Sequence, residues 1–211
     1  MQKKSIARFD ETAENWDAKP TRVKLAHAVA QEIISTIPVH KKMTSLEFGC
    51  GTGLVGLELA PKLQHLTAID TSANMLANLE QKMVQQNLSN ITTRKIDLCT
   101  EPLPEKFDLI FSSMTLHHIP DIPAILSILS SRLNKDGYLA LTDLDCEDGS
   151  FHSDNSTDTR HNGFNHKNLG KLLTKAGFYD ITFKTIFTIE KERNNSVLKS
   201  YPVFLATARK T

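Results

Sequence analysis

The stretch LEFGCGTGLVG combines closely spaced glycines with one carboxylate, and it fits two kinds of ligand-binding turn. Read from its second glycine, the pattern Gly51-x-Gly53-x-x-Gly56 matches the dinucleotide fingerprint of NAD and FAD enzymes. Read from its carboxylate, the pattern Glu47-x-Gly49-x-Gly51-x-Gly53 is a different signature. In both interpretations the glycines let the backbone approach a ligand, and the helix that follows offers free N–H groups. The glycine spacing alone does not decide between them.

Carboxylates at the ends of the first three expected strands separate the two interpretations better. Glu47 comes two residues before the first glycine, where it would repel a pyrophosphate but suit a cationic amine or sulfonium. Asp70 ends the second strand, where it could hold the ribose of either cofactor or simply cap a helix. Asp97 ends the third strand, where it could accept a hydrogen bond from an adenine amino group.

The elements that must position these residues alternate between strand and helix. Apolar spacing predicts strands over 43–48, 65–70, 91–97, 107–113 and 138–145, and helices over 21–37, 53–62, 72–86, 122–133 and 166–176. A polar arm precedes the first helix, a turn is expected at 136–137, and a loop covers 146–164. Such alternation indicates a parallel, doubly wound sheet.

The C-terminal part breaks this alternation. Strands expected over 181–191 and 201–210 are joined by a polar stretch that is too short for a parallel crossover, so they must pair antiparallel. The expected fold class is therefore α/β: a doubly wound, Rossmann-like sandwich with a mostly parallel seven-stranded sheet, closed by an antiparallel C-terminal hairpin. Ligands bind such sheets at the carboxyl ends of the strands, where the carboxylates above fall.

Length and charge narrow the function classes. The 211 residues suffice for one domain over 1–211, with the arm and helix of 1–40 as a lid and 41–211 as the cofactor-binding sheet core. Lys and Arg total 25 against 24 Asp and Glu, so no nucleic-acid partner is indicated. No signal peptide or membrane-spanning run is apparent, and the 3 scattered cysteines suggest reduced thiols, so we expect a cytoplasmic protein.

Several motifs in this order and spacing resemble one family, the class I S-adenosylmethionine-dependent methyltransferases. The resemblance is to the small "type 11" group related to ubiquinone and menaquinone methylases, and it covers most of residues 40–211. The motifs that carry it are LEFGCGTG (46–53), AIDTSANML (68–76), KIDL (95–98), FDLIFSSMTLHHI (107–119) and GYLALTD (137–143). It implies S-adenosyl-L-methionine as cofactor and S-adenosyl-L-homocysteine as product.

The resemblance also implies roles around the methionine and ribose of that cofactor. Glu47, Gly49 and Gly51 would line the methionine end. Asp70 would bind the ribose hydroxyls, and Met75 would pack near the adenine. Met75 at helical spacing could equally be an ordinary core residue.

At the adenine edge and above the site the resemblance implies four further residues. Asp97 and Leu98 would lie at the adenine edge, and Ser113 would lie along the cofactor near the methyl group. Trp16 would be the aromatic residue of the N-terminal lid, or no more than an anchor for the arm. Cys50 receives no catalytic role.

The reaction implied is an in-line displacement of the methyl group by an O, N, S or C nucleophile, for which the protein mainly positions and desolvates the reactants. A base is needed only if the nucleophile carries a proton of high pKa. His117 is the first candidate, followed by Asp143 and then by His152 or His161 from the long loop. A histidine at 117 could also simply pack and bond to backbone, and His118 is a weaker candidate.

A metal site and several acceptor classes are disfavoured. His152, His161 and His166 lie in or beside the loop with Asp154 and Asp158, but their spacing fits no compact ligand motif, so no metal is expected. The sequence lacks an Asn/Asp-Pro-Pro-Tyr or Pro-Cys motif after the fourth strand, a basic tRNA track and clustered cysteines. A small-molecule acceptor is therefore expected, of unspecified identity.

Two other functions stay open at this point. The chain could bind the cofactor without turnover, as a sensor or a subunit of a complex, although its cofactor signature is intact. It could also be an NAD-dependent oxidoreductase, but it has no evident catalytic Tyr-x-x-x-Lys, and Glu47 opposes a dinucleotide. The sequence does not indicate the oligomeric state.

Overall fold

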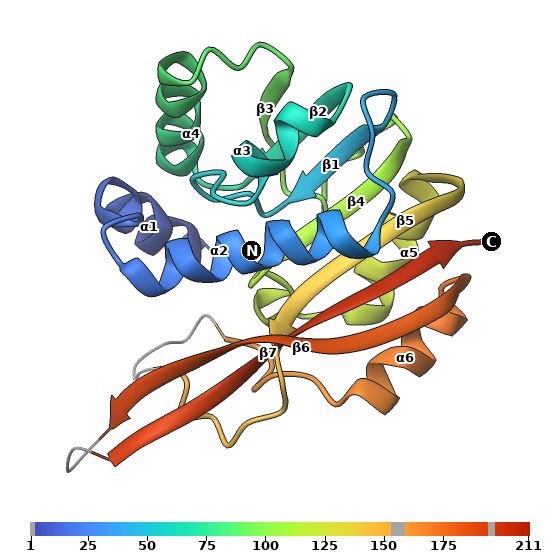
Figure 1. Ribbon diagram of the computed structural model, residues 1–211. Helices are drawn as coiled ribbons and strands as arrows, with labels where there is room; N and C mark the ends of the chain where they lie inside the picture. The colour runs from blue at the N-terminus through green and yellow to red at the C-terminus, as the bar shows by residue number, and fades with distance from the viewer. Residues whose placement is uncertain (1–2, 153–158, 194–196) are drawn as a thin grey trace.

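A computed structural model describes residues 3–152, 159–193 and 197–211 (Figure 1). They form a seven-stranded sheet with strand order β3-β2-β1-β4-β5-β7-β6. The strands are β1 Thr44–Phe48, β2 His65–Asp70, β3 Ile91–Lys95, β4 Phe107–Ser113, β5 Leu133–Leu144, β6 Phe178–Arg193 and β7 Val197–Lys210. Strands β1 to β5 pair parallel, and β7 pairs antiparallel with both β5 and β6. The expected fold class is confirmed.

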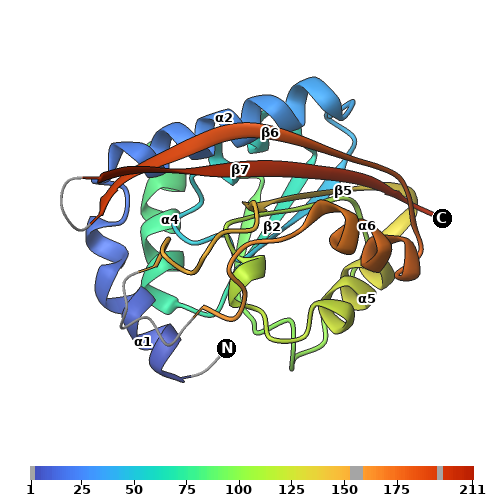
Figure 2. The same cartoon turned by 90° about the horizontal axis from the view of Figure 1, so that it is seen from below.

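Helices cover both faces of this sheet (Figure 2). They are α1 Lys3–Thr12, α2 Pro20–Thr36, α3 Gly56–Leu59, α4 Ala73–Gln85, α5 Ile122–Arg132 and α6 His166–Lys175. Side chains of β4 show how the layers alternate: Leu109 and Phe111 pack with α2, α3 and α4, whereas Ile110 packs with α5 and α6. This two-sided burial explains why β4 is apolar at its centre.

The strand order reverses beside β1, because β2 lies on one side of it and β4 on the other. In doubly wound sheets this switch point opens a crevice at the carboxyl ends of the strands. Figure 1 shows α1 and the start of α2 near that end of β1, so the arm and the switch point lie close together.

Two local predictions were wrong. The turn expected at 136–137 lies inside β5, because Leu133 already pairs with Phe107 and is 2% exposed. Asp136, with φ of 61°, marks an irregularity in the ladder there. The helix expected over 53–62 is short, because Gly53 has a φ of 75° that no helix accepts; α3 is followed by a 3-10 turn, Ala60–Lys62.

The N-terminal arm is helical, which the sequence pattern did not indicate. It consists of α1 and a 3-10 turn, Ala13–Asn15. The closing strands β6 and β7 are also longer than expected, and β3 is shorter, so Asp97 follows that strand instead of ending it.

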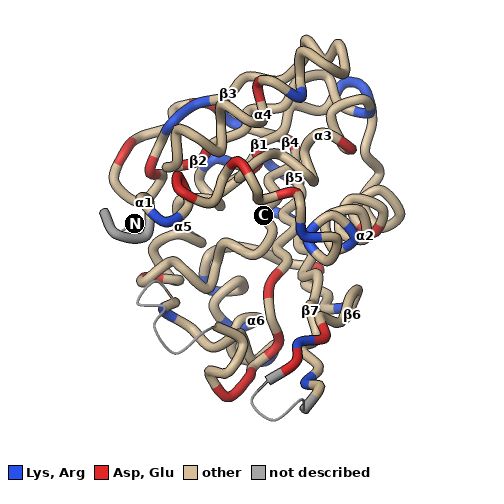
Figure 3. Tube along the Cα trace, turned by 90° about the vertical axis from the view of Figure 1, so that its left-hand side faces the viewer, with Lys and Arg blue, Asp and Glu red and all other residues tan. Residues whose placement is uncertain are grey.

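Two further findings concern the distribution of charge and the possibility of membrane-spanning helices. Acidic and basic residues are interspersed along the trace in Figure 3. Among the residues that the structure describes, no helix has both the length and the apolar character that a membrane crossing requires.

Candidate active site

The loop after β1 is fixed to β2 by backbone contacts. The N–H groups of Gly49 and Cys50 donate to the carbonyl oxygen of Ile69 over 2.9 and 3.0 Å. Gly49 has a φ of +67°, and a Cβ there would lie 2.4 Å from the Thr115 side chain. A side chain at this position would therefore clash with the segment after β4 as well as strain the backbone.

Gly56, which completes the dinucleotide-like pattern, serves the carboxylate of Glu47. A Cβ at Gly56 would lie 2.2 Å from Oε2 of Glu47, so glycine leaves room for that side chain. The backbone N–H of Gly56 also stabilises the charged form of Glu47. The packing of Glu47 therefore explains why residue 56 is glycine without any bound pyrophosphate. This favours the interpretation of the motif that starts from Glu47.

Glu47 is a buried acid with incomplete hydrogen bonding. It is 3% exposed, and its Oε2 atom has no hydrogen-bond partner among the described residues. Burial raises the pKa of Glu47 to about 8; the Gly56 N–H opposes this shift, and the nearby charge of Asp70 adds to it. A cation near a buried carboxylate of this kind would stabilise its charged form.

Asp70 ties the glycine loop to the start of α4. Its Oδ2 atom accepts from the N–H of Gly51 over 2.8 Å, and its Oδ1 atom accepts from the N–H of Ser72 over 2.9 Å. Burial raises the pKa of Asp70 although these donors oppose the shift. The cap of α4 is Ser72, whose hydroxyl accepts from the N–H of Met75, so the helix-cap interpretation of Asp70 was wrong.

A cavity of about 730 Å³ opens at the switch point of the sheet. The residues predicted for the site that line it are Trp16, Glu47, Gly49, Gly51, Asp70, Met75, Asp97, Ser113 and His117. The side chain of Leu98 is not among the lining residues: it is 2% exposed and packs into the core on the α5 side. The chain turns after β3, with Thr100 and Glu101 bonding back to the Asp97 carbonyl, and this turn sends Leu98 inward.

Two aspartates hold the N-terminal arm over this cavity. Asp10 accepts from the hydroxyl of Ser72 over 2.5 Å. Asp17 accepts from the hydroxyl of Thr52 in the glycine loop over 2.6 Å and from Lys82 of α4 over 2.7 Å. The arm is thus attached both to the loop and to the helix that carry the cofactor signature.

Trp16 lies within an aromatic and cationic group of the arm. Its ring is 5.7 Å from that of Phe9 in an edge-on arrangement, and the Arg22 guanidinium lies 3.5 Å from the ring centroid. Arg22 also donates to the Trp16 carbonyl over 3.0 Å. Trp16 therefore lines the cavity and anchors the arm at once.

His117 and Asp143 form a buried pair at the carboxyl ends of β4 and β5. Nδ1 of His117 lies 2.7 Å from Oδ1 of Asp143, and the His117 backbone N–H donates to Oδ2 over 3.0 Å. The side chains are 2% and 0% exposed. Burial alone would raise the pKa of Asp143, but His117 and the N–H of Leu144 lower it below its usual value. Asp143 thus orients the ring of His117, which lines the cavity.

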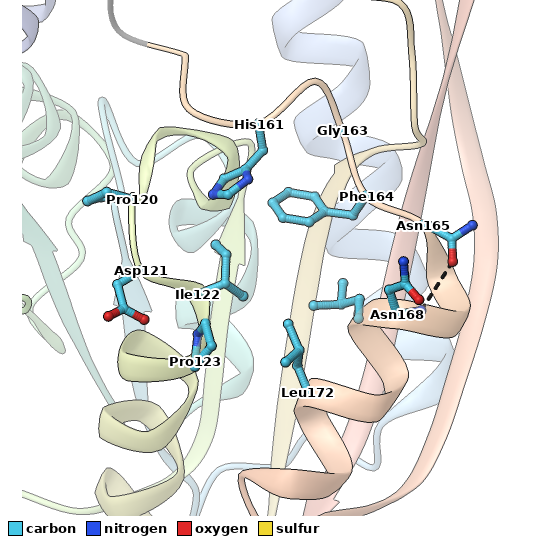
Figure 4. Close-up of a pocket in the computed structure, with 11 residues that line it drawn as sticks. Pro120, Asp121, Ile122, Pro123, His161, Gly163, Phe164, Asn165, Asn168 and Leu172 are labelled. Carbon is cyan, nitrogen blue, oxygen red and sulfur yellow. Dashed lines mark hydrogen bonds between the residues drawn. The ribbon is translucent and has the colours of Figure 1, made fainter.

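The other histidines divide between two places. His152 lines the large cavity, with its ring centroid 5.1 Å from that of His117. His161 does not: it lies in a second cavity of about 430 Å³ between the starts of α5 and α6 (Figure 4). Its Nε2 atom lies 2.9 Å from the carbonyl oxygen of Ile119, so the prediction of His161 as an alternative base was wrong.

The metal interpretation has no support among the described residues. No group of three or more His, Cys, Asp or Glu there is arranged to hold a metal ion. His166 instead pairs with Asp145 over 2.6 Å and stacks on Phe183. Asp154 and Asp158 lie outside the described residues.

Other residues line the cavity without having been predicted from the sequence. They are Arg8, Phe9, Arg22, Phe151 and Lys191, among others. Arg8 comes from α1, which the pattern did not indicate, and Lys191 comes from the edge strand β6. The polar character of the arm and the alternation along β6 carried no signal that these particular side chains converge.

The comparisons with known proteins agree with this site. Residues 22–182 match a family model described as a methyltransferase domain. The chain is 29% identical over 149 residues to an uncharacterized methyltransferase of Schizosaccharomyces pombe, covering 64% of this chain and 52% of that protein. It is 30% identical over 136 residues to malonyl-acyl-carrier-protein O-methyltransferase of Bacillus cereus, covering 63% and 49%. The chain spans about half the length of these curated relatives.

Solved structures share the fold over nearly the whole chain. The DhpI complex with S-adenosylhomocysteine superimposes with a TM-score of 0.74 at 20% identity, covering 97% of this chain and 94% of that one. A SAM-dependent methyltransferase from Aquifex aeolicus gives 0.68 at 19% identity, covering 100% of both. The fold is therefore the Rossmann-like α/β sandwich that these solved structures share. The chain belongs to the methyltransferase family whose model it matches.

Proposed function

We propose that the chain transfers the methyl group of S-adenosylmethionine to a small-molecule acceptor, with Glu47 beside the cationic end of the cofactor. The observation that carries this proposal is the buried carboxylate of Glu47, which lines the cavity and has no cation of the chain at hydrogen-bond distance among the described residues. An ammonium or sulfonium group would stabilise the charged carboxylate there. A pyrophosphate would repel it.

The remaining cofactor contacts follow from the residues around Glu47. Asp70 lines the cavity and would accept from ribose hydroxyls beside the backbone N–H groups of Gly51, Ser72 and Thr71 that already stabilise its carboxylate. Met75 and Asp97 border the region expected for the adenine, and Ser113 borders the methyl group. Gly49 and Gly51 contribute backbone, and Leu98 would contribute only its backbone.

S-adenosylmethionine supplies an already activated methyl group, so the work of the chain is to bind, align and desolvate. The arm of 1–40 serves as the lid of a single domain over 1–211, with 41–211 as its core, and it excludes water above the glycine loop. His117 is the candidate base: Asp143 fixes its Nδ1 atom, which leaves Nε2 to accept a proton from an acceptor that carries one.

Nothing in the site favours either alternative function. An NAD-dependent oxidoreductase would place phosphates against Glu47, and a non-catalytic sensor would not need the oriented His117–Asp143 pair. The dense interspersion of both charge signs also supports a small acceptor over a nucleic acid (Figure 3).

Calorimetric titration with S-adenosylmethionine, S-adenosylhomocysteine and NAD tests the proposal. We expect both adenosyl ligands to bind and NAD not to bind, and we expect Asp70→Ala to lose binding by about a hundredfold, since a buried acceptor of ribose hydroxyls is removed. Asp145→Ala, in a half-exposed pair away from the cavity, is the control and should bind normally. Binding of NAD in place of the adenosyl ligands would contradict the proposal.

A further inference from the structure

The large cavity is acidic at one end and basic at the other. Glu47, Asp70 and Asp97 line the end formed by β1, β2 and the turn after β3. Strand β6 lies at the opposite edge of the sheet from β3, and it contributes Lys191 to the cavity wall. The donor proposed above is cationic and suits the acidic end, so the basic end is left for the acceptor.

Aromatic and imidazole rings form the inner wall of the basic end. The ring centroid of His117 lies 4.0 Å from that of His118 and 5.1 Å from that of His152. The ring of Phe9 lies edge-on to His118 at 5.4 Å, and Phe151 lies edge-on to His152 at 4.9 Å. These contacts hold the histidines at fixed positions, since each ring packs on at least one neighbour.

His152 has an unsatisfied ring nitrogen at this wall of the cavity. Its Nε2 atom is buried and has no hydrogen-bond partner among the described residues. Burial lowers the pKa of His152 to about 3, and the charges of His117, His118, Lys191 and Arg8 lower it further. A ring with so low a pKa is neutral at pH 7, so it can offer an anion only a neutral N–H, and the full positive charges at this wall are those of Lys191 and Arg8.

Lys191 of β6, Arg8 of α1 and Arg22 of α2 contribute full positive charges at this end of the cavity. Nζ of Lys191 donates to the Phe151 carbonyl over 2.9 Å and lies 3.4 Å from the Phe151 ring centroid, so the ammonium is held beside His152. Burial and then repulsion from Arg8 lower the pKa of Arg22, against the opposing charge of Asp17. The arginines are thus close enough to repel each other.

One acid also lines this end of the cavity. Glu190 precedes Lys191 on β6, and its carboxylate lies 2.7 and 2.8 Å from the hydroxyl of Ser200 on β7. That contact directs it along the hairpin surface, where the two strands pair. Among the described residues of this end, the balance of charge is therefore positive: Arg8, Arg22 and Lys191 against Glu190.

We propose that the basic end, defined by Arg8, His152 and Lys191, is the acceptor subsite and selects acceptors that bear an anionic oxyacid group, a carboxylate or a phosphate. This inference rests on the proposed function, because the acidic end must hold the cationic donor. An oxyacid offers several acceptor lone pairs to N–H donors, and charge-assisted hydrogen bonds to Lys and Arg are stronger than the neutral one that the His152 ring can donate. A cationic donor and an anionic acceptor in one cavity also attract each other.

Calorimetry on the protein saturated with S-adenosylhomocysteine tests this subsite with matched probes. Benzoate is compared with benzamide and malonate with malonamide, so that each amide keeps the shape of its carboxylate and lacks the charge. Inorganic phosphate is the third anion tested. We expect at least one anion to bind about tenfold more tightly than its neutral counterpart, or phosphate to bind where the amides do not. Preference for phosphate over both carboxylates would assign a phosphorylated acceptor; the reverse would assign a carboxylic acid.

Variants of Lys191 test whether this residue causes the preference for anions. Lys191→Gln should weaken the preferred anion about tenfold, and Lys191→Arg should restore it, because both cations donate to an oxyacid. Lys184→Gln, on the same strand but in an exposed pair with Glu32, is the control and should change nothing. S-adenosylhomocysteine affinity should stay the same in all three variants.

The outcomes separate this inference from the function on which it rests. Normal binding of S-adenosylhomocysteine together with no preference for any anion, including no binding of any probe, overturns the acceptor subsite and leaves the proposed function intact. An anion preference that persists in Lys191→Gln also overturns it. Failure of S-adenosylhomocysteine to bind overturns the proposed function and the subsite together.

Discussion

The two ends of the large cavity are built in different ways. The acidic end comes from consecutive strand ends, and its loop is fixed by backbone N–H groups that donate to Ile69 and Asp70. The basic end brings together side chains from α1, the turn after β4, the loop after β5 and strand β6. A site made from neighbouring strand ends is tied to the sheet itself, whereas a site made from distant segments can vary while the sheet is kept.

The junction between the two ends is the buried His117–Asp143 pair, and breaking it should have the largest effect. Asp143→Ala would leave the His117 ring and two backbone N–H groups without their acceptor. We expect a loss of about 3–5 kcal/mol in the free energy of unfolding, measured by urea denaturation. Asp145→Ala breaks a half-exposed pair with His166 and should cost less than about 1 kcal/mol. Equal losses would show that the pair does not anchor the junction.

The acidic end should depend strongly on one charge. Glu47→Gln keeps the shape of the side chain but removes its charge, so we expect S-adenosylmethionine affinity to fall about a hundredfold. The fall for S-adenosylhomocysteine should be smaller because that ligand has lost the sulfonium charge. Glu58→Gln, in a half-exposed pair with His27, should leave both affinities unchanged in the same titrations. An equal fall for both ligands would mean that Glu47 does not sense the sulfonium.

The same carboxylate should destabilise the ligand-free protein as pH rises. Because burial raises the pKa of Glu47 to about 8, folding favours its protonated form. The stability from that form is present below the unfolded pKa, near 4.5, and is lost as pH rises through 8. In thermal unfolding, the Tm of Glu47→Gln should therefore exceed that of the wild type by a margin that widens from pH 5 to pH 8. A margin independent of pH would remove the buried-charge explanation.

The lid should give the smallest effect. Asp17→Asn weakens the links of the arm to Thr52 and Lys82, each a surface or half-buried contact. We expect cofactor affinity to fall about tenfold or less, with a change in the fluorescence of Trp16, the only tryptophan in the sequence. Glu14→Gln, at an exposed position in the 3-10 turn just before Asp17, is the matched control. Unchanged affinity and fluorescence in Asp17→Asn would mean that these links do not position the arm.

The acidic end could be predicted from the sequence because its signals are local. Glycines and carboxylates at successive strand ends mark the switch point wherever strand and helix alternate, and Glu47, Asp70 and Asp97 all line the cavity. The orientation of Leu98 was harder to predict from the sequence. A shift of one residue at the end of a turn decides whether a side chain faces the cavity or the core. The Leu98 backbone could still serve the predicted role.

The basic end could not be predicted in the same way. Arg8 lies on a helix that the polar arm did not indicate, and its place depends on the Asp10 and Asp17 contacts with other elements. Lys191 lies on a strand whose neighbours are set by the sheet order, and His161 lies in the smaller cavity while His152 lines the larger one. Contacts between distant segments of the chain leave no periodic pattern in the sequence.

The central claim is that Glu47 receives the positive charge of the cofactor, and proton release on binding tests it most directly. Titrating S-adenosylmethionine at pH 7 in buffers of different ionisation enthalpy measures the protons released. Because the pKa of Glu47 is about 8 without a ligand, the wild type should release between about half and one proton as the cation lowers that pKa. Glu47→Gln should release none. Equal release by the two proteins would contradict the account.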